Sequence, residues 1–358
     1  MAETATNPSD ISETQAAIAA ALEGVEKRFD HQLRSDLPPV SRLVSHVEHY
    51  RGKMLRPTLA LVCGLAAPSA ASGRHTAPSL SPDHITVAAV CEMIHMATLV
   101  HDDVLDEADT RRRGATVNRL AGNEAAVILG DYLIASAYHL CSQLDSQKVA
   151  LLVGHVSMTL CAGELLQLSH RNDLSLDEPT YFEIVERKTA SLIGLACRLG
   201  AQCSGADDAT CARFERFGAK LGVAFQIQDD LLDLTGQQST LGKPAGKDME
   251  KGKLTLPMIH HLAAIRPGDR ARSLFLLERA CGIKADGKTA SPVPHTETPG
   301  DAAAELRHAL ESSGSVAHSV RVAERLVSEA KLELAGIAQS GAKAILMMMA
   351  EAVVKRAF

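Results

Sequence analysis

Apolar residues recur every three or four positions along most of the chain, from about residue 15 to residue 280. Long stretches in this range lack proline and glycine, and strict alternation of polar and β-branched residues is nearly absent. This periodicity predicts helices and not strands. The last segment, from about residue 302 to residue 356, is expected to add two or three further helices. We therefore predict an all-α protein without a sheet.

Two segments interrupt the helical pattern, at residues 66–83 and 284–301. Both are rich in Pro and in small or polar residues, so we expect surface loops that join helices. Residues 1–14 are small and polar, and we expect a flexible tail there. Length alone suggests about two domains, but the continuous helical pattern favours a single all-helical domain over residues 15–358.

Composition and charge narrow the classes of function. The chain has 358 residues, a formal net charge of −6 and 22% charged residues, which is ordinary for a soluble protein. There is no basic stripe and no zinc-finger spacing, so nothing indicates a nucleic-acid partner. The N-terminus lacks the apolar core of a signal peptide, and we find no apolar run of about 18 residues. We therefore expect no transmembrane segment.

The eight cysteines are scattered and none form a CxxC pair. Most lie on predicted apolar faces, where a free cysteine behaves as a small hydrophobic residue. We expect buried, reduced thiols and a cytoplasmic protein.

The strongest chemical signal is LVHDDVLDEADTRRRG at residues 99–114. It follows an apolar helix pattern that begins near residue 84. Asp102 and Asp106 stand four positions apart on this helix and share a face, with Asp103 alongside. Like charges at this spacing repel by roughly 0.2–0.5 kcal/mol in an isolated helix. The repulsion suggests that a cation compensates it.

A second copy of the pattern, Asp229, Asp230 and Asp233, lies in FQIQDDLLDLTG at residues 225–236. A single DDxxD is weak evidence, because it could be an ordinary solvated helix end. Here two copies each occupy the C-terminal end of an apolar helix, where carboxylates are unfavourable. Departures from a local rule are expected at functional sites, so both copies are candidate metal-binding sites.

Carboxylates without other ligand types suit Mg²⁺, which keeps several waters and commonly bridges carboxylates to substrate phosphates. Mn²⁺ is an alternative ion. Arg111, Arg112 and Arg113 follow the first motif directly and can bind phosphate oxygens. Further basic residues occur in RGKMLRP, ERKTAS and LGKPAGKDMEKGKLTLP. The pattern predicts a Mg²⁺ site that binds more than one polyanionic ligand.

These motifs, in this order, resemble the all-trans polyprenyl diphosphate synthase family, octaprenyl or long-chain type. The resemblance covers roughly Arg51 to Pro257 and includes HITVAAVCEMIHMATLVHDD, GDYLIASA, GELLQL, ERKTASLIGLACRLGA, FQIQDDLLD and GKDMEKGKLTLP. It implies the isoprenoid synthase fold, a bundle of mostly antiparallel helices around a deep central cavity. It also implies a homodimer that condenses isopentenyl diphosphate head to tail with an allylic diphosphate.

The resemblance also implies roles for single residues. The expected metal ligands are Asp102, Asp103, Asp106, Asp229 and Asp233. The residues expected to hold isopentenyl diphosphate are Lys53, Arg56, His95 and Arg112. Those expected to bind the allylic substrate are Arg111, Lys188, Thr189, Gln226 and Lys243, and Lys253 is a further residue expected to bind substrate. Residues expected to be needed for catalysis are Asp102, Asp106, Arg111, Lys188, Thr189, Gln226 and Asp229.

Three positions depart from the family pattern. Arg51 and Arg113 stand where glycine is usual, and Met54 replaces a common basic residue. Arg113 could alter the loop after the first motif or add a contact to a diphosphate, and the sequence leaves this open.

Small residues before the first motif predict a long product. Short-chain family members carry a bulky aromatic residue four or five positions before the first aspartate, where this chain has Thr98 and Ala97. Together with Ile94 these residues lie on one helical stripe, along which a prenyl tail could grow. We expect a long-chain product of the kind that supplies a quinone side chain. If Ile94 closed the cavity, the product would be geranylgeranyl diphosphate; a farnesyl diphosphate synthase is the other alternative.

Two further functions share part of the pattern. A terpene cyclase also ionises a diphosphate at a DDxxD motif, but it uses a different second metal motif and favours aromatic-lined cavities. This chain has no Trp, four Tyr and seven Phe. A non-catalytic subunit of a heteromeric synthase usually lacks one or both aspartate motifs, and both are intact here. Both functions are therefore weaker hypotheses than the prenyltransferase.

Overall fold

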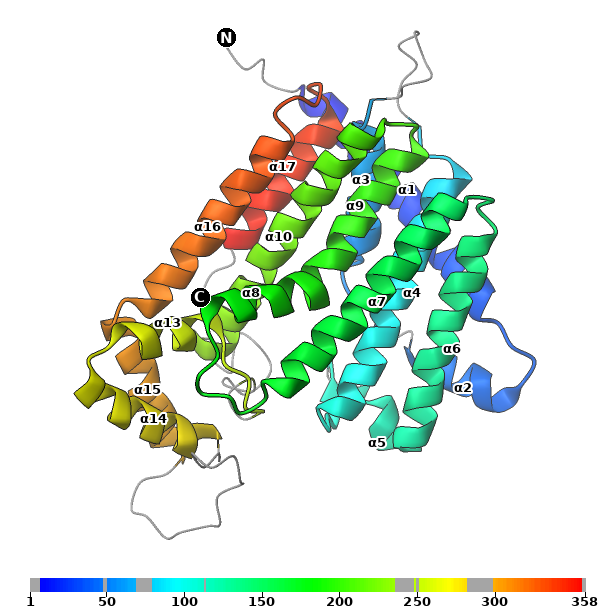
Figure 1. Ribbon diagram of the computed structural model, residues 1–358. Helices are drawn as coiled ribbons and strands as arrows, with labels where there is room; N and C mark the ends of the chain where they lie inside the picture. The colour runs from blue at the N-terminus through cyan, green and yellow to red at the C-terminus, as the bar shows by residue number, and fades with distance from the viewer. Residues whose placement is uncertain are drawn as a thin grey trace. The chain divides into compact units, whose positions relative to one another are not determined.

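The computed structural model describes residues 7–47, 50–68, 79–112, 114–235, 248, 251–281 and 299–355 (Figure 1). Two residues named above, Arg113 and Lys243, lie outside the described residues, as does much of the two predicted loops. The helices of the described residues are, in chain order, α1 (Pro8–Leu33), α2 (Pro38–Val47), α3 (Leu55–Ala66), α4 (Pro82–Leu105), α5 (Val117–Ala121), α6 (Asn123–Ser142), α7 (Gln147–Ser169), α8 (Glu178–Val185), α9 (Ser191–Cys203), α10 (Asp208–Thr235), α13 (Leu256–Ala264), α14 (Pro267–Cys281), α15 (Pro299–Ser312), α16 (Ser315–Glu333) and α17 (Gly341–Val354).

The predicted all-α class is confirmed, with two local additions. Two-residue strands, β1 (Thr110–Arg111) and β2 (Gly114–Ala115), pair in antiparallel register directly after the first aspartate motif. A five-residue π-helix, η2 (Glu186–Ala190), joins α8 to α9. Neither element has a periodic pattern long enough to be predicted from the sequence.

The chain divides into two compact units. Unit 1 comprises residues 1–158, 191–219 and 330–349, and unit 2 comprises residues 159–190, 220–329 and 350–358. The first aspartate motif belongs to unit 1 and the second to unit 2. The single domain expected over residues 15–358 stays a prediction.

In unit 1, α4 packs against α1, α3, α6 and α9. Its side chains are buried almost continuously from Thr86 to Ile94, as expected for a helix that is apolar all round. Where α3 and α9 approach each other, Gly200 leaves room for the Ala60 carbonyl, because a Cβ on Gly200 would lie 1.9 Å from that oxygen. This close packing holds α3, which carries Arg56 near its first turn.

In unit 2, the residues after α7 form a short helix and then the π-helix. Asp177 caps α8, since its side chain accepts a hydrogen bond from the Thr180 backbone N–H at 2.9 Å. Within α7, Gly163 allows η2 to approach, because a Cβ on Gly163 would lie 2.7 Å from Arg187 Cβ and 2.8 Å from Lys188 N. The glycine therefore lets η2 pack directly on α7.

Seven cysteines are free thiols: Cys63, Cys91, Cys141, Cys161, Cys197, Cys203 and Cys211. Five of them are buried, Cys203 is half-buried and Cys161 is exposed. The expectation of buried thiols is confirmed for most of these residues but is wrong for Cys161.

Three helices, α4, α6 and α7, are long and apolar enough to cross a membrane by length and composition. Of their most apolar 18-residue windows, 72%, 44% and 28% respectively are buried inside the protein. The high value for α4 is typical of a core helix, whereas α6 and α7 present apolar side chains at the surface. The expected absence of a transmembrane segment stays a prediction.

Candidate active site

Helix α4 extends into the first motif and ends there. Its last residue is Leu105, and Asp106 follows as the C-cap, with its backbone N–H donating to the Asp102 carbonyl at 2.8 Å. Glu107 then adopts a left-handed backbone with φ of 48°, which ends the helix. Asp102 and Asp106 are half-buried, so both carboxylates remain accessible to a ligand.

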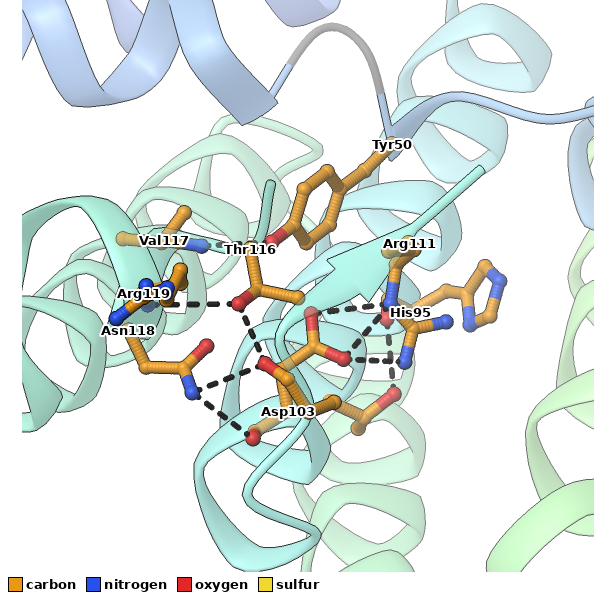
Figure 2. Close-up of polar contacts among 10 residues, drawn as sticks. Tyr50, His95, Asp103, Arg111, Thr116, Val117, Asn118 and Arg119 are labelled. Carbon is orange, nitrogen blue, oxygen red and sulfur yellow. Dashed lines mark hydrogen bonds and ion pairs between the residues drawn. The ribbon is translucent and has the colours of Figure 1, made fainter. Parts of the chain in front are cut away.

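Asp103 lies on the inner side of α4 and binds Arg111 (Figure 2). Arg111 Nε donates to both carboxylate oxygens at 3.0 Å, and Nη2 donates to Oδ1 at 2.8 Å. Burial alone would lower the pKa of Arg111, but the hydrogen bonds and charge of Asp103 raise it above its ordinary value. Asp103, expected to bind metal, and Arg111, expected to bind diphosphate, therefore contact each other in this structure.

The turn after α4 is tied to the helix by polar contacts (Figure 2). Thr116 Oγ1 donates to the Ala108 carbonyl at 2.5 Å, and Asn118 Nδ2 donates to the carbonyls of Asp103 and Ala108 at 3.3 and 3.2 Å. The hydroxyl of Tyr50 accepts a hydrogen bond from the Val117 backbone N–H at 2.9 Å. These contacts hold β1, and with it the backbone of Arg111.

Unit 1 also brings together Arg56, His95 and Arg112, three of the four residues expected to bind isopentenyl diphosphate. Arg112 donates to the carbonyl of Tyr50, and its guanidinium lies against Gly52, where a Cβ would be 2.2 Å from Nη2. Burial lowers the pKa of Arg56. Burial, followed by the charges of Arg56, Arg111 and Arg112, holds the pKa of His95 well below its usual range. His95 is therefore a neutral imidazole among guanidinium groups, in surroundings that favour an anion.

Glu92 was not singled out as a site residue. It lies one turn before His95 on α4, is 2% exposed, and its Oε2 atom is buried without a hydrogen-bond partner. Burial raises its pKa although the charges of Arg56, Arg112 and Arg51 oppose this. A carboxylate inside an otherwise apolar helix was the signal in the sequence that could have identified it.

The three residues expected to control product length lie on α4. Ile94 and Ala97 are buried, at 2% and 0% exposure. Thr98 is half-buried, and its hydroxyl donates to the His95 carbonyl at 2.8 Å. Ala97 is thus closely packed, and a larger side chain there must displace its surroundings.

In unit 2, the second motif occupies the last two turns of α10 and its middle aspartate faces inward. Asp230 is 5% exposed and accepts hydrogen bonds from the Tyr181 hydroxyl at 2.7 Å and from Gln226 Nε2 at 2.8 Å. Burial, with the charge of Asp248 next, raises the pKa of Asp230 to about 8. Asp233 Oδ2 accepts a hydrogen bond from the Asp248 backbone N–H at 3.1 Å.

The π-helix places Lys188 and Thr189 beside α7 and α10. Lys188 forms an ion pair with Glu164 and donates to Gln167 Oε1 at 2.9 Å. Thr189 Oγ1 donates to Gln226 Oε1 at 3.0 Å. Short π-helical segments are frequent at functional sites, which agrees with the roles expected for these two residues.

A cavity of about 120 Å³ lies within unit 2. Its lining includes the expected residues Lys188, Thr189, Gln226 and Lys253. Tyr181 and Asp248, which the sequence analysis did not identify, also line it. Tyr181 lies in no repeated motif that would have marked it, whereas Asp248 lies in the segment GKDMEKGKLTLP but was given no role of its own.

The carboxylates fit a metal ion that needs few protein ligands. Among the described residues, no group of three or more His, Cys, Asp and Glu side chains could hold a metal by itself. The accessible pair Asp102 and Asp106 offers oxygen donors only. Mg²⁺ is commonly bound by one or two carboxylates together with water and substrate phosphate, so this donor set suits it.

Comparison with known proteins connects both units to one family. The family model for polyprenyl synthetase matches residues 38–288. Octaprenyl diphosphate synthase of Haemophilus influenzae is 34% identical over 278 residues, which cover 78% of this chain and 80% of the relative. Short chain isoprenyl diphosphate synthase of Methanothermobacter thermautotrophicus is 31% identical over 332 residues, covering 90% and 92%.

A solved structure agrees with these sequence similarities. The crystal structure of polyprenyl synthase from Caulobacter crescentus, complexed with calcium and isoprenyl diphosphate, matches with a TM-score of 0.83 and 29% sequence identity. The match covers 97% of this chain and 98% of the other. It confirms the all-α isoprenoid synthase fold. The chain therefore belongs to the polyprenyl synthetase family and is a trans-polyprenyl diphosphate synthase.

Proposed function

We propose that this enzyme condenses isopentenyl diphosphate head to tail with an allylic diphosphate in a Mg²⁺-dependent reaction, and that its product is a long-chain polyprenyl diphosphate for a quinone side chain. The observation that carries the proposal is the pair of aspartate motifs, each at the end of a largely buried helix. Each motif shares its unit with cationic groups suited to diphosphate.

Unit 1 supplies one set of contacts in this proposal. Asp102 and Asp106 would hold Mg²⁺ with the allylic diphosphate, and Arg111 would bind that diphosphate once it turns from Asp103. Asp103 is assigned as a metal ligand by resemblance, but its contact with Arg111 favours a role in orienting the arginine. The residues proposed to bind isopentenyl diphosphate are Lys53, Arg56, His95 and Arg112.

Unit 2 supplies the second set. Asp229 and Asp233 would hold Mg²⁺ with an allylic diphosphate. Lys188, Thr189 and Gln226 would contact the allylic substrate near its reacting carbon. Lys243 and Lys253 are proposed to bind its phosphate oxygens.

The chemistry needs positioning more than proton transfer by side chains. Bound Mg²⁺ would supply neutralisation of the leaving diphosphate and Lewis-acid activation. The allylic C–O bond breaks, and its electron pair leaves with the diphosphate. The double bond of isopentenyl diphosphate attacks the allylic cation, and a proton then passes to the departed diphosphate. The protein residues orient the two anions and exclude water from the cation.

The proposal of a long product depends on α4. The small side chains of Ala97 and Thr98 support it, because neither fills the space of an aromatic ring. The relatives do not decide between product lengths, since one is named as an octaprenyl and another as a short-chain synthase. Geranylgeranyl and farnesyl diphosphate remain the alternative products.

We also propose that the enzyme is a cytoplasmic homodimer. Ile128 on α6 is 67% exposed, and Leu151 and Met158 on α7 are 67% and 73% exposed. Large apolar side chains at a surface support burial against a partner. Light scattering should give twice the chain mass of 38.1 kDa. An active monomer at micromolar concentration would contradict the homodimer.

Metal dependence tests the proposed reaction. The purified chain is stripped with EDTA and then mixed with radiolabelled isopentenyl diphosphate and farnesyl diphosphate. We expect no transfer of label into acid-labile prenyl product until Mg²⁺ is added back, with Mn²⁺ as a substitute. Transfer at the full rate without a divalent ion would contradict the proposal.

A further inference from the structure

The second motif contains a middle aspartate whose surroundings differ from those of its neighbours. We propose that Asp230 and Tyr181 are positioning residues that hold the amide of Gln226 and the hydroxyl of Thr189, and that Asp230 is not a metal ligand. The inference deepens the proposed function and rests on it, because that function assigns Gln226 and Thr189 to the allylic substrate.

The geometry of α10 separates two rows of side chains. Asp229 and Asp233 are four residues apart and share one face, whereas Gln226 and Asp230 are four apart and share another. Successive residues on a helix point about 100° apart, so Asp229 and Asp230 cannot present their carboxylates in one direction. The first row is half-buried, while Asp230 is 5% exposed.

Both carboxylate oxygens of Asp230 are already occupied. Tyr181 donates to Oδ2 at 2.7 Å, and Gln226 donates to Oδ1 at 2.8 Å. Tyr181 is itself 4% exposed. Mg²⁺ keeps several water ligands, and a carboxylate enclosed in this way leaves little room for a hydrated ion.

The contacts form one directed chain of hydrogen bonds. The Gln226 amide nitrogen donates to Asp230, so its oxygen is turned to Thr189 and accepts from that hydroxyl at 3.0 Å. This series of hydrogen bonds therefore links α8, α10 and η2 through Tyr181, Asp230, Gln226 and Thr189. The Asp230 oxygen that accepts from Gln226 determines which end of the amide faces Thr189.

An amide at position 230 would disturb this order while keeping the shape. In Asp230→Asn, one of the two side-chain positions is always an NH2 donor, so the hydrogen bonds that Tyr181 and Gln226 both donate to Asp230 cannot both be kept. Removing only the Tyr181 hydroxyl, in Tyr181→Phe, frees the carboxylate to rotate. Both variants should misorient Thr189 without removing a metal ligand.

The test compares three variants, Asp230→Asn, Tyr181→Phe and Asp229→Asn, the last being the same substitution one residue away. The first readout needs no turnover: thermal melting is followed as Mg²⁺ is titrated in the presence of inorganic diphosphate. We expect the Mg²⁺ concentration for half-maximal stabilisation to rise strongly in Asp229→Asn and to stay at the wild-type value in the other two.

The second readout is steady-state condensation. We expect kcat to fall roughly 10–100-fold in Asp230→Asn and Tyr181→Phe, as for other residues that orient a ligand-binding group, with KM for isopentenyl diphosphate unchanged.

A Mg²⁺ midpoint in Asp230→Asn as high as in Asp229→Asn would overturn the inference. So would wild-type kcat in Tyr181→Phe, which also decides the question if Asp230→Asn does not fold. If the proposed function is wrong, the wild-type chain will not catalyse condensation. The melting experiment would still show whether Asp230 binds Mg²⁺.

Discussion

Among single residues, Asp102 gives the sharpest test of the first motif, because its side chain is half-buried whereas that of Asp103 is buried. Removing a ligand from a metal that stabilises a leaving diphosphate should lower turnover by orders of magnitude. We therefore expect Asp102→Ala and Asp229→Ala to retain the wild-type melting temperature within a few degrees and to lose nearly all condensation.

The matched control for these variants is Asp109→Ala. Asp109 lies in the same acidic segment, but its side chain is 78% exposed and its partner is Arg119 at 3.6 Å. Turnover of Asp109→Ala should equal that of the wild type. Equal activity of Asp102→Ala and Asp109→Ala would remove the metal assignment of the first motif.

His95 gives the fold a predictable dependence on pH. Its pKa in the folded protein is well below the unfolded value of about 6.5, chiefly because of burial. Below about pH 6.5 the unfolded chain therefore binds a proton that the folded chain does not, and the free energy of unfolding falls as the pH decreases. We expect the His95→Gln variant to lose less stability than the wild type between about pH 7.5 and pH 5.5. Urea unfolding at both pH values measures this, and an equal loss in the two proteins would contradict it.

The close contact between α7 and η2 holds Lys188 and Thr189 in position within unit 2. A Cβ on Gly163 would lie 2.8 Å from the backbone nitrogen of Lys188, and backbone cannot move aside cheaply. We expect Gly163→Ala to lower both the melting temperature and kcat, because η2 must shift and take Lys188 and Thr189 with it.

Gly154, on the same helix, is the matched control for this substitution. A Cβ there meets nothing within 4 Å, and replacing glycine by alanine inside a helix is ordinarily stabilising by about 0.5–1 kcal/mol. Gly154→Ala should therefore be at least as stable and as active as the wild type. If both variants behaved alike, the close packing of η2 would have no functional importance.

Helix α4 carries the prediction about product length. Ala97→Phe introduces an aromatic ring at a position with 0% exposure, and we expect the prenyl chain to stop earlier. Overpacking a core position costs about 1–3 kcal/mol, so the melting temperature must be measured alongside the product. Thr98→Phe, at a half-buried position, repeats the test with less strain. Products as long as those of the wild type in both folded variants would contradict a tunnel along α4.

At the level of elements, the helices were predictable because their apolar spacing is regular over many turns. The end of α4 inside the first motif was also expected, but its last residue, Leu105, was not predictable, since it depends on the positive φ of Glu107 and on the turn held by Thr116. The π-helix was also not predictable, because its hydrogen bonds join residues five apart instead of four and its five residues are too few to show a period of their own. Tyr181 lies in the site because its hydroxyl contacts Asp230 in the tertiary structure, and the residues next to it in the sequence form no motif.

At the level of the whole molecule, the two units are built from interleaved parts of the chain. Helices α7 and α10 each run from one unit into the other without a break in their pattern, so composition could not divide them. The two motifs were nevertheless predictable as partners, because both repeat the same spacing of carboxylates.

The size of the product made by the purified chain alone tests the central claim most directly. Radiolabelled isopentenyl diphosphate, farnesyl diphosphate and Mg²⁺ are supplied, and the dephosphorylated products are separated by reversed-phase thin-layer chromatography. We predict incorporation of label into linear all-trans polyprenols longer than geranylgeraniol, without any second protein. A cyclic hydrocarbon free of label, or no incorporation until another subunit is added, would contradict the account.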